Sequence, residues 1–388
     1  MDTVYLDNAA TTQIDKDVIS AMHESMQTNF GNPSSTHAFG RKAKAALENA
    51  RKSISALLHV SSSSIVFTSG GTEADNTAIN CAVRDLGVTR IISSKIEHHA
   101  VLNCVEFLDL ENRIKLDFVN LDEHGSVDLS HLETLLKSDA DSKTLVSLMH
   151  INNEIGNILD LKAVGELCQT YGAYFHSDTV QSVGHYEMNL SQLPVDFIAV
   201  SAHKFHGPKG AGFMYVRNRA QLKPLIHGGS QERELRAGTE SIHNIVGLQK
   251  AMELAYGNLE KEATYIKSLK SYFISSLKEA IPGVRFNGHS GDLDKSTYTL
   301  VNVSIPLSQA ESDMMLFQLD LKGIACSKGS ACQSGAQLGS FVLNEVYGEN
   351  LDYPGLRFSF SKYTTKKELD YVVLTLKSLS TSKASGQF

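Results

Sequence analysis

The chain has 388 residues, of which 42% are hydrophobic and 20% charged, and its formal net charge at pH 7 is −7. This length allows a large core and more than one lobe. The acidic balance argues against a nucleic-acid-binding or an anionic-membrane-binding protein. The opening sequence MDTVYLDNAATT lacks the basic-then-apolar order of a secretory signal, and no apolar run approaches the ~18 residues of a spanning helix. The five cysteines form no CxxC pair, so we expect no metal site, no disulfide framework and a cytoplasmic location.

The larger part of the chain alternates helical patterns with short apolar runs. Apolar residues recur at helical spacing over 37–59, which predicts a helix. Seven strand-like runs follow, several of them separated by helix-length polar segments: 65–67, 90–92, 115–119, 145–149, 173–177, 197–201 and 212–216. This alternation predicts an α/β fold with a mostly parallel seven-stranded sheet and helices on both faces.

The pattern changes in the last third of the chain. Two helices and two strands are predicted there, at about 260–280, 308–321, 297–304 and 356–360. Thr365 and Glu368 form a capping box ahead of a final helix. We therefore expect a large domain over 14–255 and a smaller α+β domain formed by 1–13 and 256–388.

Ligands of open α/β sheets bind beyond the carboxyl ends of the strands, so the residues after the strand-like runs are candidates for a site. After 65–67, the sequence TSGGTEADN leads into a helix that starts at about residue 73. Backbone N–H groups and the positive end of the helix dipole favour an anion such as phosphate there. A tight turn with Thr72 as the helix N-cap fits this stretch equally well.

Polar side chains follow two other runs. His98 and His99 lie in SSKIEHHAV, and neighbours on a regular element diverge, so we do not expect them to share one metal. The sequence HINNEIGN, after 145–149, is typical of a binding loop, and a solvated turn fits it equally well.

Asp178 and Lys204 each follow a buried strand-like run. A buried acid is costly unless paired, so Asp178 is interpreted as a metal ligand, a helix N-cap or the partner of a protonated ring nitrogen. Desolvation would lower the pKa of the Lys204 amine toward that of a usable nucleophile, although an ordinary surface lysine is the default interpretation. An anion cradle, an imidazole, an acid and a partly buried lysine are together the set that pyridoxal phosphate requires.

The sequence resembles the cysteine desulfurases, of the fold-type I, class V aminotransferase group, nearly from end to end. The resemblance is carried by ordered motifs: YLDNAATT at 5–12, GNPSS with His37 at 31–37, TSGGTEADN at 68–76, EHHAV at 97–101, NNEIG at 152–156, HSDTVQS at 176–182, SAHKFHGPKG at 201–210, RAGTES at 236–241, GSAC at 329–332 and LRFSF at 356–360. It implies a pyridoxal 5'-phosphate enzyme that removes sulfur from L-cysteine and releases L-alanine.

The resemblance also implies the residues of the site. Lys204 would form the Schiff base and move the Cα proton, Asp178 would pair with the pyridine nitrogen, and His98 would stack on the ring. Cys332 would take the sulfur as a persulfide, and its thiolate would need a nearby cation or imidazole. The implied binding residues are Asn153 and Gln181 at the phenolic oxygen, Gly71, Thr72, Ser201 and His203 at the phosphate, Thr239 at the phosphate of the neighbouring subunit of a homodimer, and Arg357 with Asn32 at the substrate carboxylate.

The two cysteines near the end of the chain receive different interpretations. The small residues around Cys332, at about 323–341, resemble the family branch with a long catalytic loop, and we expect a flexible arm. Such an arm would deliver sulfur to an acceptor protein, an iron–sulfur scaffold or another sulfur carrier. Cys326 is interpreted as a buried structural thiol at the end of a strand, rather than as a second relay.

Two other functions remain open at this point. One is a different pyridoxal phosphate enzyme of the same fold, such as a selenocysteine lyase or an aminotransferase. The other is a non-catalytic scaffold for sulfur assembly. An aminotransferase has no use for a loop cysteine, and the joint presence of Lys204, Asp178, His98, Arg357 and Cys332 argues against the scaffold.

Overall fold

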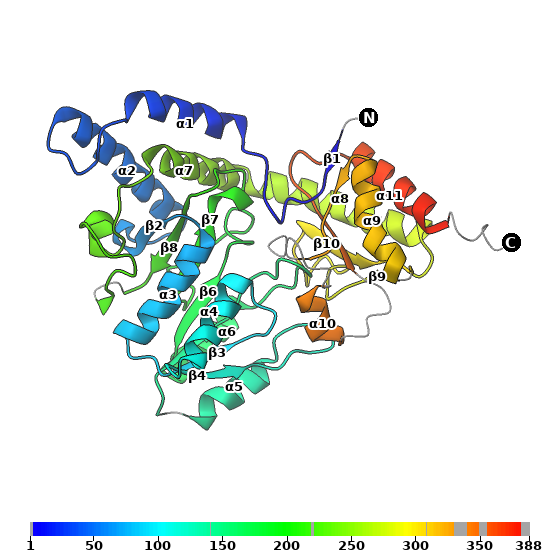
Figure 1. Cartoon of the computed structure of the whole chain (residues 1–388), viewed down its shortest axis with the longest axis horizontal. Helices are drawn as coiled ribbons and strands as arrows, with labels where there is room; N and C mark the ends of the chain where they lie inside the picture. The colour runs from blue at the N-terminus through cyan, green and yellow to red at the C-terminus, as the bar shows by residue number, and fades with distance from the viewer. Residues whose placement is uncertain are drawn as a thin grey trace.

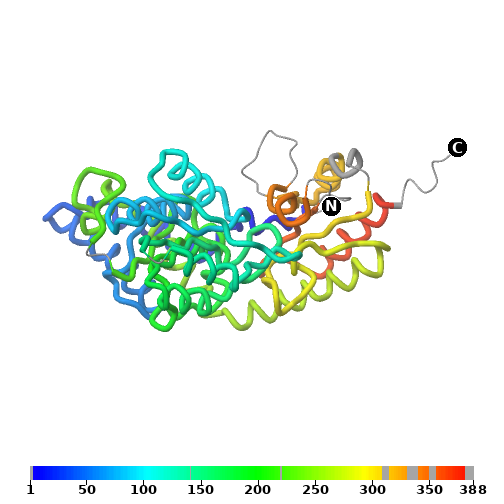
Figure 2. The backbone as a smooth tube through the Cα atoms, turned by 90° about the horizontal axis from the view of Figure 1, so that it is seen from below, coloured from blue at the N-terminus to red at the C-terminus, as the bar shows by residue number. Residues whose placement is uncertain are grey.

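The computed structural model describes residues 3–139, 141–218, 221–307, 309–329, 340–348 and 355–381. The larger sheet and the smaller group of helices and strands lie side by side along the long axis (Figures 1 and 2). In Figure 2 the long helix α8 (Leu259–Ala280) runs along the lower side of the smaller part. β1 (Val4–Tyr5) and α11 (Lys366–Thr381), the first and last described elements, both lie at the smaller part (Figure 1).

The larger part is built on a seven-stranded sheet with the order β2-β8-β7-β6-β5-β3-β4. Its strands are β2 (Ile65–Thr68), β3 (Arg90–Ser93), β4 (Lys115–Phe118), β5 (Thr144–Ser147), β6 (Tyr174–Asp178), β7 (Phe197–Ser201) and β8 (Gly212–Val216). Only β8 is antiparallel to its neighbours, and the other pairs are parallel. The predicted strands and the mostly parallel sheet are therefore confirmed.

Helices cover both faces of this sheet, as predicted. α3 (Gly71–Asp85) and α4 (His99–Leu110) pack on one face in a core that contains Val66. The opposite face carries Ile65 and Phe67 and is covered by α2 (Ala38–Leu57), α5 (Leu129–Ser138), α6 (Leu161–Thr170) and α7 (Ile242–Gly257), with α1 (Lys16–Thr28) outside them against α7. Successive strand residues thus face opposite cores, which explains why strands such as β2, β7 and β8 carry apolar residues on both faces.

The smaller part has its own core, which includes the aromatic cluster of Phe273, Phe358 and Phe360. α8 packs against α11 (Lys366–Thr381) there, and the antiparallel sheet β12-β10-β9 (Gly355–Ser359, Leu300–Ser304, Arg285–Phe286) lies beside them. The remaining elements are α9 (Gln309–Leu321), α10 (Phe341–Tyr347) and the parallel pair β1 (Val4–Tyr5) and β11 (Ile324–Ala325). The capping box is confirmed, because the Glu368 carboxylate accepts from Thr365 N at 2.6 Å and Thr365 Oγ1 accepts from Glu368 N at 3.3 Å.

The domain boundaries stay a prediction. The predicted assignment of residues 1–13 to the smaller domain is supported by Val4 and Leu6, which are buried in the second core. The next core residue along the chain, Val18, belongs to the first core. In the described part of the chain, no helix combines the length and the apolar character needed to cross a bilayer, and no cluster of metal-ligating side chains occurs.

Two details differ from the sequence prediction. The alternative that made Thr72 an N-cap is wrong, because α3 starts at Gly71 and its N-cap is Gly70, with a φ of 154° that favours glycine. The strand predicted from residue 297 starts only at Leu300, because Thr297 N donates to Gly156 O instead of to a strand.

Lys270 gives the second core a pH-dependent stability. Its fully buried Nζ donates to Ser296 Oγ at 2.6 Å and to Thr297 O at 2.7 Å. Burial lowers the pKa of this amine from 10.5 to about 7. Between these values the unfolded chain binds a proton that the folded chain does not, so the free energy of unfolding should rise with pH by about 1.4 kcal/mol per unit.

Lys270→Met should remove this contribution, and thermal unfolding followed from pH 7 to pH 10 tests it. We expect the midpoint of wild type to rise with pH relative to that of the variant. Lys267→Met is the matched control, because Lys267 lies on the same helix but is half exposed. Parallel pH curves for wild type and Lys270→Met would contradict the prediction.

Candidate functional site

A cavity of about 460 Å³ lies at the carboxyl ends of β2, β6 and β7. β2 and β7 run parallel because each is antiparallel to β8, so their ends reach the same edge of the sheet. The cavity is lined by Ala10, Ser69, Gly70, Gly71, Thr72, Glu73, Asp75, His98, Met149, Asn153, Asp178, Val180, Gln181, Ser201, His203, Lys204, Lys209 and Gly210. The rule that ligands bind beyond strand ends therefore located this site.

One end of the cavity is a cradle for an anion at the start of α3. Gly70 adopts a φ of 154°, and the chain turns there from β2 into the helix. A Cβ atom on Gly71 would lie 2.6 Å from Val180 Cγ2, so this position accepts only glycine without a shift. The first N–H groups of a helix lack intrahelical acceptors and favour negative charge, which suits a phosphate.

Lys204 lies at the end of a single 3₁₀ turn (Ala202–Lys204) that follows β7. Its half-buried ammonium donates to the carbonyl oxygens of Ala9 at 2.6 Å and Ala10 at 3.0 Å. Gln181 Nε2 donates to the same Ala9 oxygen at 3.0 Å. Backbone oxygens from the N-terminal segment therefore orient both side chains in the cavity.

Asp178 is the last residue of β6 and is 6% exposed. One carboxylate oxygen accepts from Val180 N at 2.8 Å. Burial raises the pKa of the carboxyl group, while His98, the Val180 N–H and Lys204 act in the opposite direction. A cationic ring nitrogen in the cavity would further favour the carboxylate form.

His98 is the N-cap of α4, and its Nδ1 accepts from Ala100 N at 3.1 Å. Burial is the main cause that lowers the pKa of its imidazole, and Lys204 and His99 lower it further. Burial likewise lowers the pKa of His203 to about 4, and its Nδ1 lies 3.1 Å from Thr11 Oγ1. Both rings are therefore neutral at pH 7, and the acceptor role of His98 Nδ1 places its proton on Nε2.

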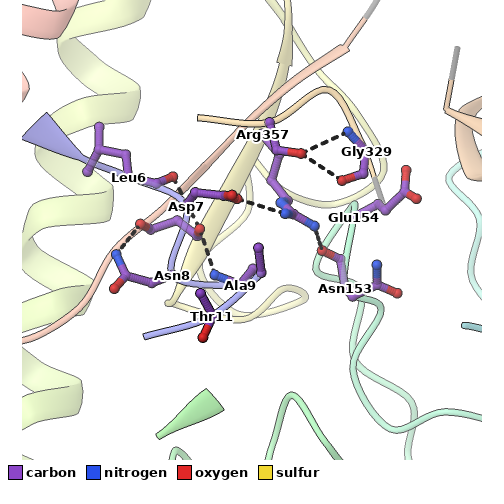
Figure 3. A network of polar contacts seen from close by, with 12 residues as sticks. Leu6, Asp7, Asn8, Ala9, Thr11, Asn153, Glu154, Gly329 and Arg357 are labelled. Carbon is purple, nitrogen blue, oxygen red and sulfur yellow. Dashed lines mark hydrogen bonds and ion pairs between the residues drawn. The ribbon is translucent and has the colours of Figure 1, made fainter. Parts of the chain in front are cut away.

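Arg357 lies on β12 between two segments that border the cavity (Figure 3). The side chain is 1% exposed, and it donates from Nη2 to Asp7 Oδ1 at 2.9 Å and from Nη1 to Asn153 O at 2.8 Å. Two buried polar atoms nearby, Arg357 Nε and Asn153 Oδ1, have no hydrogen-bond partner among the described residues. Because Asn153 lines the cavity, its orphaned oxygen can accept a hydrogen bond from a ligand there.

Nine of the predicted site residues line this same cavity. They are Gly71, Thr72, His98, Asn153, Asp178, Gln181, Ser201, His203 and Lys204. Asn32 and Thr239 are exposed and do not line it, and neither does the buried Arg357. Cys332 and most of its expected arm lie outside the described residues.

Sequence reasoning missed several groups of the site. Neither the Ala9 and Ala10 carbonyls nor the Asp7 carboxylate was predicted, although all three lie in the YLDNAATT motif. Asp75 was also missed, and it lines the cavity 3.3 Å from His176 Nε2. Burial, and after it the neighbouring acids Asp178 and Glu97, raise the pKa of Asp75 well above its usual value. Burial lowers the pKa of His176 to about 3.

Cys326 follows β11 and packs against the second core, which agrees with the prediction of a strand end. Burial and the nearby Asp7 raise the pKa of its thiol to about 12. Since only a thiolate attacks well, Cys326 is a poor nucleophile at pH 7.

These residues fit pyridoxal phosphate. The start of α3 suits its phosphate, Lys204 its aldehyde, and the buried Asp178 carboxylate its ring nitrogen. The orphaned Asn153 Oδ1 and the neutral His98 ring lie on the same cavity.

Comparison with known proteins agrees with this assignment. The aminotransferase class-V family matches residues 4–372. The chain is 41% identical over 373 residues to the cysteine desulfurase IscS of Dictyoglomus turgidum, with 95% of this chain and 92% of the relative covered. A solved NifS-like protein superposes with a TM-score of 0.88 at 33% identity, covering 97% and 99% of the two chains. The structure of SspA in complex with cysteine superposes with a TM-score of 0.78 at 28% identity, covering 94% and 100%.

Gly71→Ala should weaken the binding of pyridoxal phosphate about tenfold, or ~1.4 kcal/mol. The new Cβ must push Val180 away from the cradle. Fluorescence titration of the cofactor-free protein with pyridoxal phosphate measures the change. Gly257→Ala is the control, since a Cβ there meets nothing within 4 Å. Equal affinities for Gly71→Ala and wild type would contradict the assignment of the cradle.

Proposed function

Since the chain belongs to the aminotransferase class-V family, we propose that it is a pyridoxal phosphate-dependent cysteine desulfurase. The observation that carries the proposal is that Lys204, Asp178, His98 and Gly71 meet on one cavity. The relative from Dictyoglomus turgidum bears the name of this activity, and the SspA structure contains cysteine. L-cysteine is therefore the substrate that we assign.

The cofactor-binding residues act by charge and by shape. The cradle at Gly71 and Thr72, with Ser201 and His203, would hold the phosphate, and Thr239 would contact the phosphate of a partner subunit in a homodimer. The exposure of Thr239 is what such a contact requires. Once bound, pyridoxal phosphate supplies an electron sink that stabilises negative charge at the substrate Cα.

Three side chains would control the chemistry at the ring. Asp178, buried and bonded to Val180 N, would pair with the ring nitrogen of the cofactor, and this pairing would favour both the carboxylate and the protonated nitrogen. His98 presents a neutral ring for stacking, with its Nδ1 occupied by Ala100 N. Lys204 would hold the cofactor through its amine and would carry the Cα proton of the substrate.

Arg357 would bind the substrate carboxylate with assistance from Asn32. Among the described residues the Nε donor of the guanidinium has no acceptor, while Asp7 and Asn153 fix the orientation of the group. A guanidinium that is held in place loses less conformational entropy when it binds a carboxylate.

Cys332 would take the sulfur in a balanced exchange. Its thiolate attacks the sulfur of L-cysteine, the new S–S bond forms, and the Cβ–S bond breaks. The electron pair of that bond stays on the substrate, which takes up a proton and leaves as L-alanine. The persulfide on Cys332 would then pass to an acceptor protein, an iron–sulfur scaffold or another sulfur carrier, in the cytoplasm.

Lys204→Ala should abolish the visible absorption band that a lysine Schiff base gives to the bound cofactor. Spectra of the purified protein with added pyridoxal phosphate test this. Lys209→Ala is the matched control, because this lysine also lines the cavity and should leave the band in place. A band that disappears in Lys209→Ala and persists in Lys204→Ala would reverse the assignment.

Cys332→Ser should keep the cofactor and lose most production of L-alanine from L-cysteine, because a hydroxyl group is a far weaker nucleophile toward sulfur. Alanine and reductant-released sulfide are measured in parallel. Cys326→Ser is the control and should retain turnover, since its thiol is held protonated. Unchanged turnover in Cys332→Ser would remove the persulfide role.

A further inference from the structure

We infer that Glu154 is a positioning residue for sulfur transfer, because its carboxylate accepts a hydrogen bond from Ser340 at one end of the segment that carries Cys332 and packs beside Gly329 at the other end. The inference rests on the proposed function, which makes Cys332 the sulfur acceptor.

The first end of the segment is fixed to the strand that carries Arg357. Ser327 N donates to Arg357 O at 3.1 Å, and Arg357 N donates to Ser327 O at 2.6 Å. Gly329, two residues on, is buried beside the Glu154 carboxylate (Figure 3). A Cβ atom on Gly329 would lie 2.9 Å from Glu154 Oε2 and 3.3 Å from Ser340 Cβ.

The second end is fixed to the same carboxylate. Ser340 Oγ donates to Glu154 Oε2 and also accepts from Leu343 N at 3.0 Å as the N-cap of α10. Gly329 and Ser340 are thus neighbours in space, and Glu154 Oε2 accepts from Ser340 and leaves no room for a side chain on Gly329. One buried carboxylate oxygen closes the base of the segment.

Glu154 itself is held by the backbone around it. Its amide N and that of Ile155 donate to Asn152 Oδ1 at 2.9 and 3.0 Å, and its carbonyl accepts from Asn302 Nδ2 at 3.0 Å. The side chain is fully buried. The preceding residue, Asn153, lines the cofactor cavity, so the anchor is one residue from the site.

This geometry predicts an effect on one step of the reaction. Fixing the two flanks of a segment near a site raises the effective concentration of a group that the segment carries. If the Ser340 bond to Glu154 is lost, we expect a slower attack by Cys332 on the substrate sulfur. Binding of the cofactor and removal of the Cα proton do not involve Cys332, so these steps should continue at their normal rates.

The test compares Glu154→Ala, Ser340→Ala and the double variant with wild type, all as holoenzymes. In a single turnover with L-cysteine, each should form the Cys332 persulfide about tenfold more slowly. The double variant should be no slower than Glu154→Ala, because both changes break one contact. Glu154→Gln keeps an acceptor oxygen for Ser340 and should recover most of the rate.

A second measurement separates positioning from damage to the cavity. Exchange of the Cα proton of L-alanine with deuterium from solvent, followed by NMR, needs the cofactor and Lys204 but not Cys332. It should stay within about twofold of wild type in every variant. Ser290→Ala is the control, since it removes a buried serine hydroxyl bond to Asn302 O in the same part of the molecule and should change neither rate.

Two outcomes would overturn the inference: persulfide formation at the wild-type rate in Glu154→Ala, or proton exchange that falls in parallel with it. Failure of the proposed function is distinguishable from both. In that case wild type itself would show no proton exchange, or Cys332→Ser would turn over L-cysteine normally.

Discussion

The contacts of the N-terminal segment 7–12 are the interaction on which the site depends. This segment leaves the second core at Leu6 and crosses to the loop after β7. On one side Asn8 Nδ2 and Ala9 N bond to Ser359 on β12, and on the other Thr12 N bonds to His203 O. The segment is thus bonded both to β12, which carries Arg357, and to the loop that carries His203 and Lys204. The position of one core relative to the other therefore sets the distance between Arg357 and Lys204.

Buried charge in the cavity is arranged so that few groups stay ionised. Burial keeps His98 and His203 neutral and disfavours the charged form of Asp75. Two neighbouring carboxyl groups in a dry site do not both ionise readily, so their proton affinities separate. The Asp178 carboxylate is favoured by the Val180 N–H, by His98 and by Lys204. Among the described residues, the ion-pair partner of Asp75 is His176. Of these two carboxyl groups, Asp178 therefore has the surroundings that better support a negative charge.

Much of this arrangement was predictable because it follows from strand ends and from side chains. The strands were apolar on both faces, and Asp178, Lys204 and the glycines of the cradle follow them directly. The carbonyls of Ala9 and Ala10 were not predictable, since every residue has a carbonyl and only the tertiary fold selects which ones meet Lys204. The pairing of Asp7 with Arg357 joins residues 350 positions apart, a separation that no local pattern encodes.

That pairing also explains how a buried cation is kept ready for a carboxylate. An unpaired guanidinium with 1% exposure would cost several kcal/mol. Asp7 offsets this cost before substrate arrives, and the Asn153 carbonyl satisfies a second nitrogen. The remaining Nε donor has no acceptor among the described residues, and under the proposed function a substrate carboxylate would supply one. Because the backbone of the same arginine pairs with Ser327, the residue that would recognise the substrate also anchors the segment leading to Cys332.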